Sequence, residues 1–338
     1  MGVRCLAEPA SNQQALHFPT GTREEYIADL PAVRPKILAN ITSLIEKSIA
    51  GGYYPGAVVL VGHSGSIIYQ GVFGNQQLAP QIVPLQFTSI FDLASLTKVI
   101  VTTTAVMQLI ERGQLDLDQT IVSYWPEFAK NGKENVTVRA LLTHTSGLQP
   151  ILPAWNPPQD QGQRYAEGIR QVEHIALANT PGTVFVYSDI NFLALGHLVE
   201  LITAEPLNQY AQKHIFDALN MTSATFLPPS NLKFQIAPTF SPEFKAERWG
   251  QVNDPATERM GGVSGVAGMF ANAQDIGTFL QCLLDGGRVS DQNYLLGPLT
   301  ILKMTTPQSP PGVQELRGLG WDIGSSYSNR GGLVPRGS

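Results

Sequence analysis

The chain has 338 residues, of which 43% are hydrophobic and 14% charged, as in a soluble globular protein with a substantial core. Lys and Arg total 22 against 27 Asp and Glu, which gives a formal net charge of −5, and no run of five basic residues occurs. This composition argues against nucleic acid or an anionic membrane as a partner, and no uncharged run reaches the ~18–20 apolar residues of a membrane span.

A helix and a hairpin are the first predicted elements. Within residues 36–50 apolar side chains recur with helical spacing, and Gly51-Gly52 follows as a stop signal. The stretch "AVVLVGHSGSIIYQGVFG" then contains two β-rich runs around the turn sequence "HSGS". This pattern predicts an antiparallel hairpin.

Helical patterns dominate after residue 90, over 95–112, 166–179, 191–203, 207–220 and 273–285, and "GLGWDIG" at 318–324 is typical of a late strand. This order predicts an α+β fold, in which the late strand completes the early antiparallel sheet and the helical middle is an insertion beside it. A ligand cleft is expected between the two lobes. We assign 1–35 to an N-terminal extension, 36–90 and 290–338 to an α/β lobe, and 91–289 to a helical lobe.

Neither a metal nor a cofactor is predicted. The two cysteines, Cys5 and Cys282, are too few for a disulfide framework and lack metal-ligand spacing. The six histidines are scattered, without an HxxxH or HxH pair.

Ser95 and Lys98 open the apolar segment "SLTKVIVTTTAVMQLI". On a helix these two residues share a face, because side chains at i and i+3 are neighbours. A serine hydroxyl is a weak nucleophile until a base takes its proton, and a neutral lysine can be that base. The alternative interpretation is an N-cap serine followed by a lysine that snorkels to solvent.

The Ser-x-x-Lys pattern is weak by itself. About one match is expected by chance in a chain of this length, and Ser230 and Lys233 match it equally well. They follow two prolines and precede a β-like run, so no helix fixes their geometry. We therefore interpret the Ser230 match as a chance occurrence.

Other segments make the Ser95 match more specific: "GGYYPGAVVLVGHSGSIIYQGVFG" (51–74), "VRALLTHTSGL" (138–148), "PGTVFVYSDINFLALGHLVELITAE" (181–205) and "ERMGGVSGVAGMFANAQDIGTFLQCLLDGG" (258–287). Together with "FDLASLTKV", they resemble the serine β-lactamase and penicillin-binding protein superfamily, in particular its class C-like branch of β-lactamase-related esterases and peptidases. The resemblance covers residues 36–338 in the expected order.

The resemblance implies a β-lactamase/transpeptidase-like fold, with an antiparallel sheet flanked by helices, and a metal-independent serine hydrolase that acts through an acyl-enzyme. By the same resemblance Ser95 is the acylated nucleophile, and Lys98 is its general base or proton relay. Tyr187 matches the tyrosine of the family's Y-x-N motif, which shares proton transfer with the lysine. The alternative for Tyr187 is a core tyrosine with a satisfied hydroxyl.

Asp189 is the first departure from the family pattern, because the Y-x-N motif ends in asparagine. Asp189 is expected to contact substrate, but an ionised carboxylate only accepts hydrogen bonds. It could also pair with Lys98 and hold it charged, which opposes the base role. A literal Y-S-N occurs at Tyr327–Asn329. It follows a predicted strand, far from the helical middle, and we interpret it as chance.

The second departure is the third family motif, K-T-G or H-T-G on a strand, which is not found. "HSG" at 63–65 lies in the predicted hairpin turn, and "HTSG" at 144–147 belongs to another family segment. In relatives the motif follows a late glycine-rich loop, so we expect the C-terminal strands to be missing. A chain ending at Ser338 would then lack one oxyanion-hole donor, at a cost of about 10²–10³ in rate, and would expose a sheet edge. Weak turnover and poor solubility are the expected results.

The terminal "LVPRGS" fits either a vector-derived thrombin site or native sequence.

The leading functional hypothesis is a serine hydrolase acting on an ester, a D-amino-acid peptide or a muropeptide amide of bacterial peptidoglycan. The alternative is a catalytically impaired binding or interaction protein on the same fold. Loop 148–170, which contains Trp155, is predicted to wall the cleft. The resemblance implies a periplasmic or secreted protein, although "MGVRCLAEPASNQQ" lacks the apolar core of a signal peptide. Compartment and oligomeric state stay open.

Overall fold

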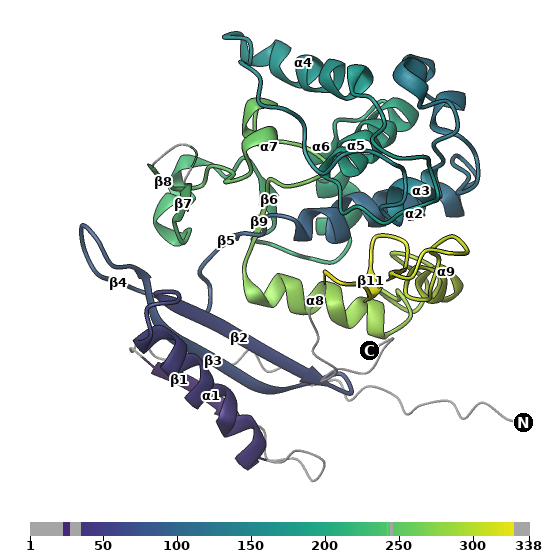
Figure 1. Cartoon of the computed structure of the whole chain (residues 1–338). Coiled ribbons are helices and arrows are strands. Elements are labelled where there is room, and N and C mark those ends of the chain that lie inside the picture. Colours follow the sequence, from purple (N-terminus) through teal and green to yellow (C-terminus); the bar gives the residue numbers. More distant parts are fainter. Residues whose placement is uncertain (1–22, 28–34, 242, 244–245, 328–338) are drawn as a thin grey trace, which may run out of the picture. The chain divides into compact units, whose positions relative to one another are not determined.

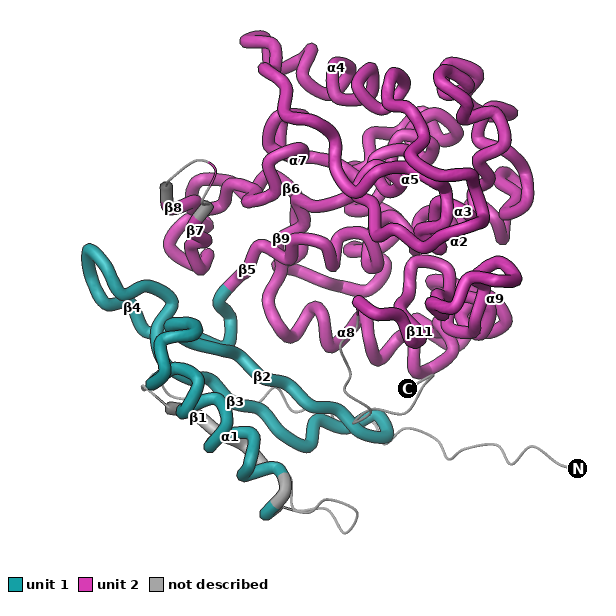
Figure 2. The backbone as a smooth tube through the Cα atoms, in the orientation of Figure 1, with its two compact units in different colours: residues 1–89 teal, residues 90–338 magenta. Residues whose placement is uncertain are grey.

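The computed structural model describes residues 23–27, 35–241, 243 and 246–327. The chain divides into two compact units, residues 1–89 and residues 90–338 (Figure 2). Cys5, Ser328, Asn329 and the terminal "LVPRGS" lie outside the described residues.

The first unit is a small antiparallel sheet with one helix. Its elements are β1 (Arg23–Ile27), α1 (Pro35–Ala50), β2 (Gly56–His63), β3 (Ser66–Gln77) and β4 (Val83–Pro84) (Figure 1). The strand order is β1-β3-β2, with β4 also paired to β3. The predicted hairpin is confirmed, because β2 and β3 pair antiparallel around a turn in which Ser64 and Gly65 both have positive φ. Helix α1 packs against β3, and the hydroxyls of Thr42 and Tyr69 lie 3.0 Å apart at this contact.

The second unit is mainly helical and carries short strand pairs. Its helices are α2 (Thr104–Glu111), α3 (Val138–Leu142), α4 (Gln161–His174), α5 (Asp189–Thr203), α6 (Leu207–Ala211), α7 (Pro255–Arg259), α8 (Ala273–Leu284) and α9 (Pro298–Met304). Its strands are β5 (Phe91–Asp92), β6 (Thr225–Phe226), β7 (Thr239–Ser241), β8 (Ala246–Arg248), β9 (Met269–Ala271), β10 (Leu316–Arg317) and β11 (Asp322–Gly324). They pair as β5-β9-β6, β7-β8 and β10-β11. Turns of π-helix cover Lys98–Thr103 and Gln212–Phe216, and 3₁₀ turns cover Ile121–Ser123, Pro126–Gly132 and Ser230–Gln235.

A buried helical segment forms the centre of this unit. The π-helical turns Lys98–Thr103 run directly into α2, and Val101, Ala105 and Leu109 are fully buried. Several residues from 99 to 104 are β-branched, so helix propensity alone does not favour this conformation. Burial against α5 stabilises it instead. The helix predicted over 95–112 is therefore confirmed from Lys98 to Glu111.

Two glycines set the distance between α5 and the loop that precedes β9. A Cβ atom on Gly196 would lie 2.9 Å from the Cα of Gly265, and one on Gly265 would lie 2.1 Å from the carbonyl oxygen of Phe192. The same loop accepts a hydrogen bond from Thr102 Oγ1 at the Gly265 carbonyl, at 2.7 Å. These contacts fix α5 against the segment that begins at Lys98.

The assignment of 290–338 to the same lobe as 36–90 stays a prediction. The described residues from 316 to 324, however, make hydrogen bonds to the second unit. The prediction that the late strand completes the early antiparallel sheet is wrong, because β11 pairs with β10. The N–H of Gly320 donates to the carbonyl of Leu142 at 3.0 Å, and the N–H of Leu319 to that of Met304 at 2.9 Å. These bonds attach residues 316–324 to the helical unit.

Lys133 provides a stability prediction. Its side chain is fully buried, and Nζ donates to the carbonyls of Lys130, Glu173 and Ile175 at 2.7, 2.8 and 2.6 Å. Lys133→Met leaves these carbonyls without that donor, at about 1–3 kcal/mol for each buried group left unsatisfied. We expect the free energy of unfolding, measured by urea titration, to fall by about 3 kcal/mol. Lys130→Met, which removes an exposed pair with Glu173, is the matched control and should cost under about 1 kcal/mol.

The same residue predicts a pH dependence of stability. Burial is the main cause that lowers the pKa of Lys133 from 10.5 to about 8. Below pH 8 the lysine is charged in both the folded and unfolded states. As pH rises from about 8 towards 10.5 the unfolded state holds more protons than the folded state, so this residue's contribution to stability increases. If the free energy of unfolding of Lys133→Met rises by the same amount over this pH range, the pH dependence does not come from Lys133.

Candidate active site

A tight turn after β5 places Ser95 at the start of the buried helical segment. Ala94 has a φ of 44°, in the left-handed region. The Asp92 carboxylate holds this turn, since it accepts the N–H of Ala94 at 2.9 Å and that of Asn253 at 2.7 Å. Burial raises the pKa of Asp92, and these two N–H donors oppose the shift.

Ser95 and Lys98 contact each other as the helical spacing predicts. Lys98 Nζ donates to Ser95 Oγ at 2.8 Å, and the lysine is only 2% exposed. The alternative, in which the lysine extends to solvent, is therefore wrong. Asp189 does pair with Lys98, which was the alternative to its role in binding substrate, because Asp189 Oδ1 lies 2.8 Å from Lys98 Nζ.

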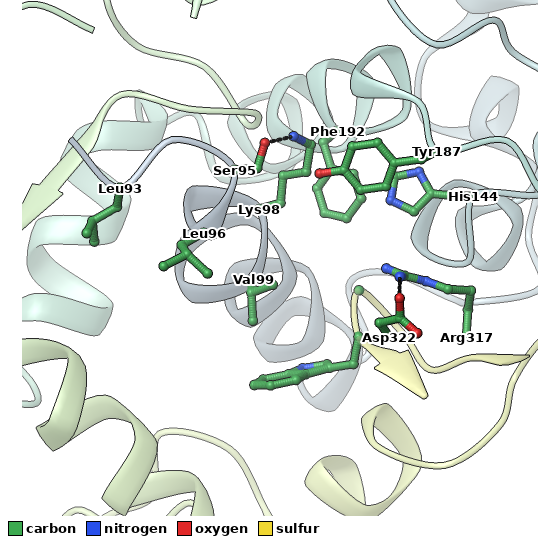
Figure 3. A pocket seen from close by; sticks show the side chains of 12 residues that line it. Leu93, Ser95, Leu96, Lys98, Val99, His144, Tyr187, Phe192, Arg317 and Asp322 are labelled. Atoms are coloured by element: carbon green, nitrogen blue, oxygen red, sulfur yellow. Dashed lines mark hydrogen bonds and ion pairs between the residues drawn. The ribbon is translucent and has the colours of Figure 1, made fainter. Parts of the chain in front are cut away.

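Tyr187 reaches the same place from the loop that precedes α5. Its ring centroid lies 5.1 Å from Lys98 Nζ, and its hydroxyl points towards the Ser95–Lys98 pair (Figure 3). The ring is flanked by His144, whose centroid is 4.5 Å away, and by Tyr327 at 4.7 Å. The interpretation of Tyr327 as a residue far from the helical middle is thus wrong, because it stacks directly on Tyr187.

The side chains meet at a cavity of about 340 Å³ within the second unit (Figure 3). It is lined by Leu93, Ser95, Leu96, Lys98, Val99, His144, Tyr187, Phe192, Arg317, Gly320, Trp321 and Asp322. Of the four predicted site residues, Ser95, Lys98 and Tyr187 line this cavity. Asp189 contacts it only through Lys98, and its side chain is 21% exposed. The predicted role of Asp189 in binding substrate stays a prediction.

Sequence reasoning did not select Arg317 or Asp322, which lie across the cavity from Leu93 and Leu96 in Figure 3. Arg317 NH1 lies 3.2 Å from Asp322 Oδ2, and its guanidinium lies 5.7 Å from the Phe185 ring centroid. Burial lowers the pKa of Arg317, and Asp322 opposes this shift. The only signal in the sequence is a pair of opposite charges on either side of the glycine-rich turn "GLG".

Other predicted features lie elsewhere. Loop 148–170 contributes no residue to the described cavity, and Trp155 instead packs against the core with Arg259 5.6 Å from its ring centroid. The prediction that this loop walls a cleft between the two lobes stays a prediction. Ser230 begins an exposed 3₁₀ turn, where Lys233 lies over the Trp249 ring.

Among the described residues, no group of three or more His, Cys, Asp or Glu is placed to hold a metal ion. Over the same part of the chain no single helix is long and apolar enough to cross a bilayer. One pair, α5 with Leu207–Phe216, passes that test together but is bent by 79°.

The fold is β-lactamase/transpeptidase-like, as the resemblance implied. The structure is similar to that of simvastatin synthase from Aspergillus terreus, with a TM-score of 0.67 and 25% sequence identity over 87% of this chain and 83% of that one. The sequence model of the Beta-lactamase family matches residues 41–335. The chain belongs to this family of hydrolases.

Two curated relatives cover most of the chain. It is 30% identical to a protein of Escherichia coli O157:H7 named "Putative D-alanyl-D-alanine carboxypeptidase", over 82% of this chain and 70% of that protein. It is also 30% identical to the N-acetylmuramyl-L-alanine amidase of Bacillus subtilis (strain 168), over 87% of this chain and 72% of that protein.

Proposed function

We propose that the chain is a serine hydrolase that forms an acyl-enzyme on Ser95. The observation that supports this most directly is the 2.8 Å contact between Ser95 Oγ and Nζ of the buried Lys98, beside a cavity that can admit an acyl group. Ser95 Oγ would attack the substrate carbonyl, the leaving group would depart, and water would then release the acyl group.

The ion pair between Lys98 and Asp189 determines which residue can accept the proton of Ser95. With Asp189 ionised, Lys98 is held as an ammonium, which donates to Ser95 Oγ and cannot accept its proton. We therefore assign the serine proton to the phenolate form of Tyr187, whose oxygen points towards the pair. Lys98 then acts as a positive charge beside the tyrosine ring, which favours the phenolate.

The proposed substrate is a D-amino-acid peptide or a muropeptide amide, with an ester as the alternative. The names of the two relatives at 30% identity support the cell-wall class. The cavity supports an acyl group with an apolar portion, because Leu93, Leu96 and Val99 line one side of it.

Trapping the acyl-enzyme tests this proposal. The chain is incubated with p-nitrophenyl acetate and, separately, with a peptide ending in D-Ala-D-Ala, quenched in acid and digested for mass spectrometry. We expect the added acyl mass on the peptide that contains Ser95, with release of p-nitrophenol or D-alanine. If neither substrate yields product or adduct, the hydrolase proposal fails for both substrate classes.

A catalytically impaired binding protein is the second candidate. The 2.8 Å Lys98–Asp189 contact favours it, because a lysine held charged cannot serve as the base. It predicts that the D-Ala-D-Ala peptide binds in calorimetry without any covalent adduct.

The variant Asp189→Asn tests how the carboxylate at this position affects acylation of Ser95. An asparagine amide can donate to a substrate carbonyl, which an ionised carboxylate cannot do, and one such bond contributes about 1 kcal/mol. We expect penicillin to acylate Ser95 about 5–10 times faster in this variant than in the wild type, measured by intact mass over time. Asp254→Asn is the matched control, because Asp254 also acts electrostatically on Asp189 and Lys98 but caps α7. Equal acceleration in both variants would mean that charge, rather than the new donor, is responsible.

A further inference from the structure

His144 occupies an unusual position between α3 and the cavity. It is 1% exposed, lines the cavity and has a φ of 59°, in the left-handed region that non-glycine residues seldom adopt. Such backbone conformations cost about 1–3 kcal/mol and occur often at functional sites. The contacts of this residue explain why the strain is retained.

The imidazole of His144 accepts two hydrogen bonds from the segment that carries Tyr187. Nδ1 lies 3.0 Å from the backbone N of Ser188 and 3.1 Å from Nδ2 of Asn191. A backbone N–H can only donate, so Nδ1 must be the acceptor. The neutral ring therefore carries its proton on Nε2.

The orientation of Asn191 agrees with this tautomer. Ser146 Oγ donates to Asn191 Oδ1 at 2.5 Å, and the N–H of Leu148 donates to Ser146 Oγ at 3.1 Å. With Oδ1 occupied by the serine, the asparagine must present its NH₂ group to His144. His144, Ser146 and Asn191 are all buried, so water does not compete for these hydrogen bonds.

The backbone and ring of His144 hold the same segment at further points. Its carbonyl accepts the N–H of Val186 at 2.9 Å. Its ring lies against the Tyr187 ring, with 4.5 Å between centroids and 31° between planes, and the two are side by side in Figure 3. His144 therefore contacts residues on both sides of Tyr187 and the Tyr187 ring itself.

Burial and nearby positive charges keep His144 Nδ1 unprotonated, so it can accept hydrogen bonds. Burial lowers the pKa of His144 well below its ordinary 6.5, and the cations Arg317 and Lys98 lower it further. The ring stays neutral near neutral pH, and Nδ1 keeps its lone pair.

We propose that His144 is a positioning residue, whose Nδ1 holds the Val186–Asn191 segment so that the Tyr187 hydroxyl faces the Ser95–Lys98 pair. This role rests on the proposed function of Tyr187 in proton transfer. The structural part of it, the hold on Ser188 and Asn191, does not depend on turnover.

Two substitutions separate the acceptor from the packing of the ring. His144→Phe keeps an aromatic ring but removes Nδ1, whereas His144→Asn removes the ring but places Oδ1 close to the former position of Nδ1. A displacement of about 1 Å at a reacting group can cost about 10²-fold in rate. With p-nitrophenyl acetate we expect kcat to fall about 100-fold in His144→Phe with KM within about threefold of wild type, and to stay within about 10-fold in His144→Asn.

Equal losses in both variants, or an unchanged kcat in His144→Phe, would overturn the proposal. If His144→Phe does not fold, His144→Gln replaces it, because its acceptor lies one bond further from the backbone and the same loss is expected.

Amide hydrogen exchange at Ser188 is measured in parallel. Faster exchange in His144→Phe but not in His144→Asn supports the hold, and unchanged exchange overturns it. A wild type without acyl-enzyme would refute the proposed function, and exchange alone would then decide the role of His144.

Discussion

Replacing Ser95 by alanine is expected to abolish covalent labelling of the chain by a fluorophosphonate, while Ser230→Ala leaves the labelling rate unchanged. Both serines precede a lysine by three residues, but only Ser95 Oγ receives a hydrogen bond from its lysine, which is buried. Lys233 is exposed and lies over the Trp249 ring instead. The two serines are thus a matched pair within one chain, with the same motif in different surroundings.

Intact mass after timed exposure to the probe measures this result. A wild type that gains a single adduct, retained in Ser230→Ala and lost in Ser95→Ala, identifies an activated nucleophile. An adduct that persists in Ser95→Ala would place the reactive group elsewhere and remove the basis of the proposed mechanism.

Lys98→Met is expected to lower the acylation rate of Ser95 by about 10³-fold, within the range of about 10²–10⁴ that positioned proton-transfer groups contribute. Methionine keeps much of the side-chain length but offers neither a proton nor a charge to Ser95 or Tyr187. The same change breaks the ion pair with Asp189, a carboxylate that is 21% exposed, so we also expect a loss of about 1–3 kcal/mol in the free energy of unfolding.

A double variant separates the two effects. In Lys98→Met/Asp189→Leu both charges are gone, so most of the lost stability should return, whereas the acylation rate should stay low. Stopped-flow acylation and urea titration of the single and double variants measure both quantities. Recovery of the rate along with stability would show that Lys98 acts only by maintaining the fold.

The sequence predicted best what depends on neighbouring residues. Ser95 and Lys98 are three apart on one helix, so their contact needed only a correct helix assignment. The predicted helix over 166–179 was placed late, because the observed α4 begins after Asp160, which accepts the N–H of Gly162 as its N-cap, and ends at His174. The cap residue Asp160 lies in a loop rich in Pro and Gln, so the sequence alone marks the start of this helix only weakly.

Residues brought in from distant segments could not be predicted in the same way. Tyr187 was assigned only through the resemblance to a family. Arg317 reaches the cavity because Gly320 hydrogen-bonds to Leu142, a contact between residues far apart in the sequence. The role of His144 depends on a backbone N–H of Ser188, and no pattern of side chains in the sequence reveals such a partner.

The π-helical turns at Lys98–Thr103 have a consequence for changes in chain length. A π-helical turn holds one residue more than an α-helical turn, and each residue of an α-helix advances by about 100° around its axis. Deleting one residue between Val99 and Thr103 would restore a regular α-helix and rotate Lys98 by about that angle relative to the buried face of α2. The Ser95–Lys98 pair could then keep its place beside Tyr187, or α2 could keep its core packing, but not both. This short segment therefore tolerates no shortening, unlike the exposed turns of the same unit.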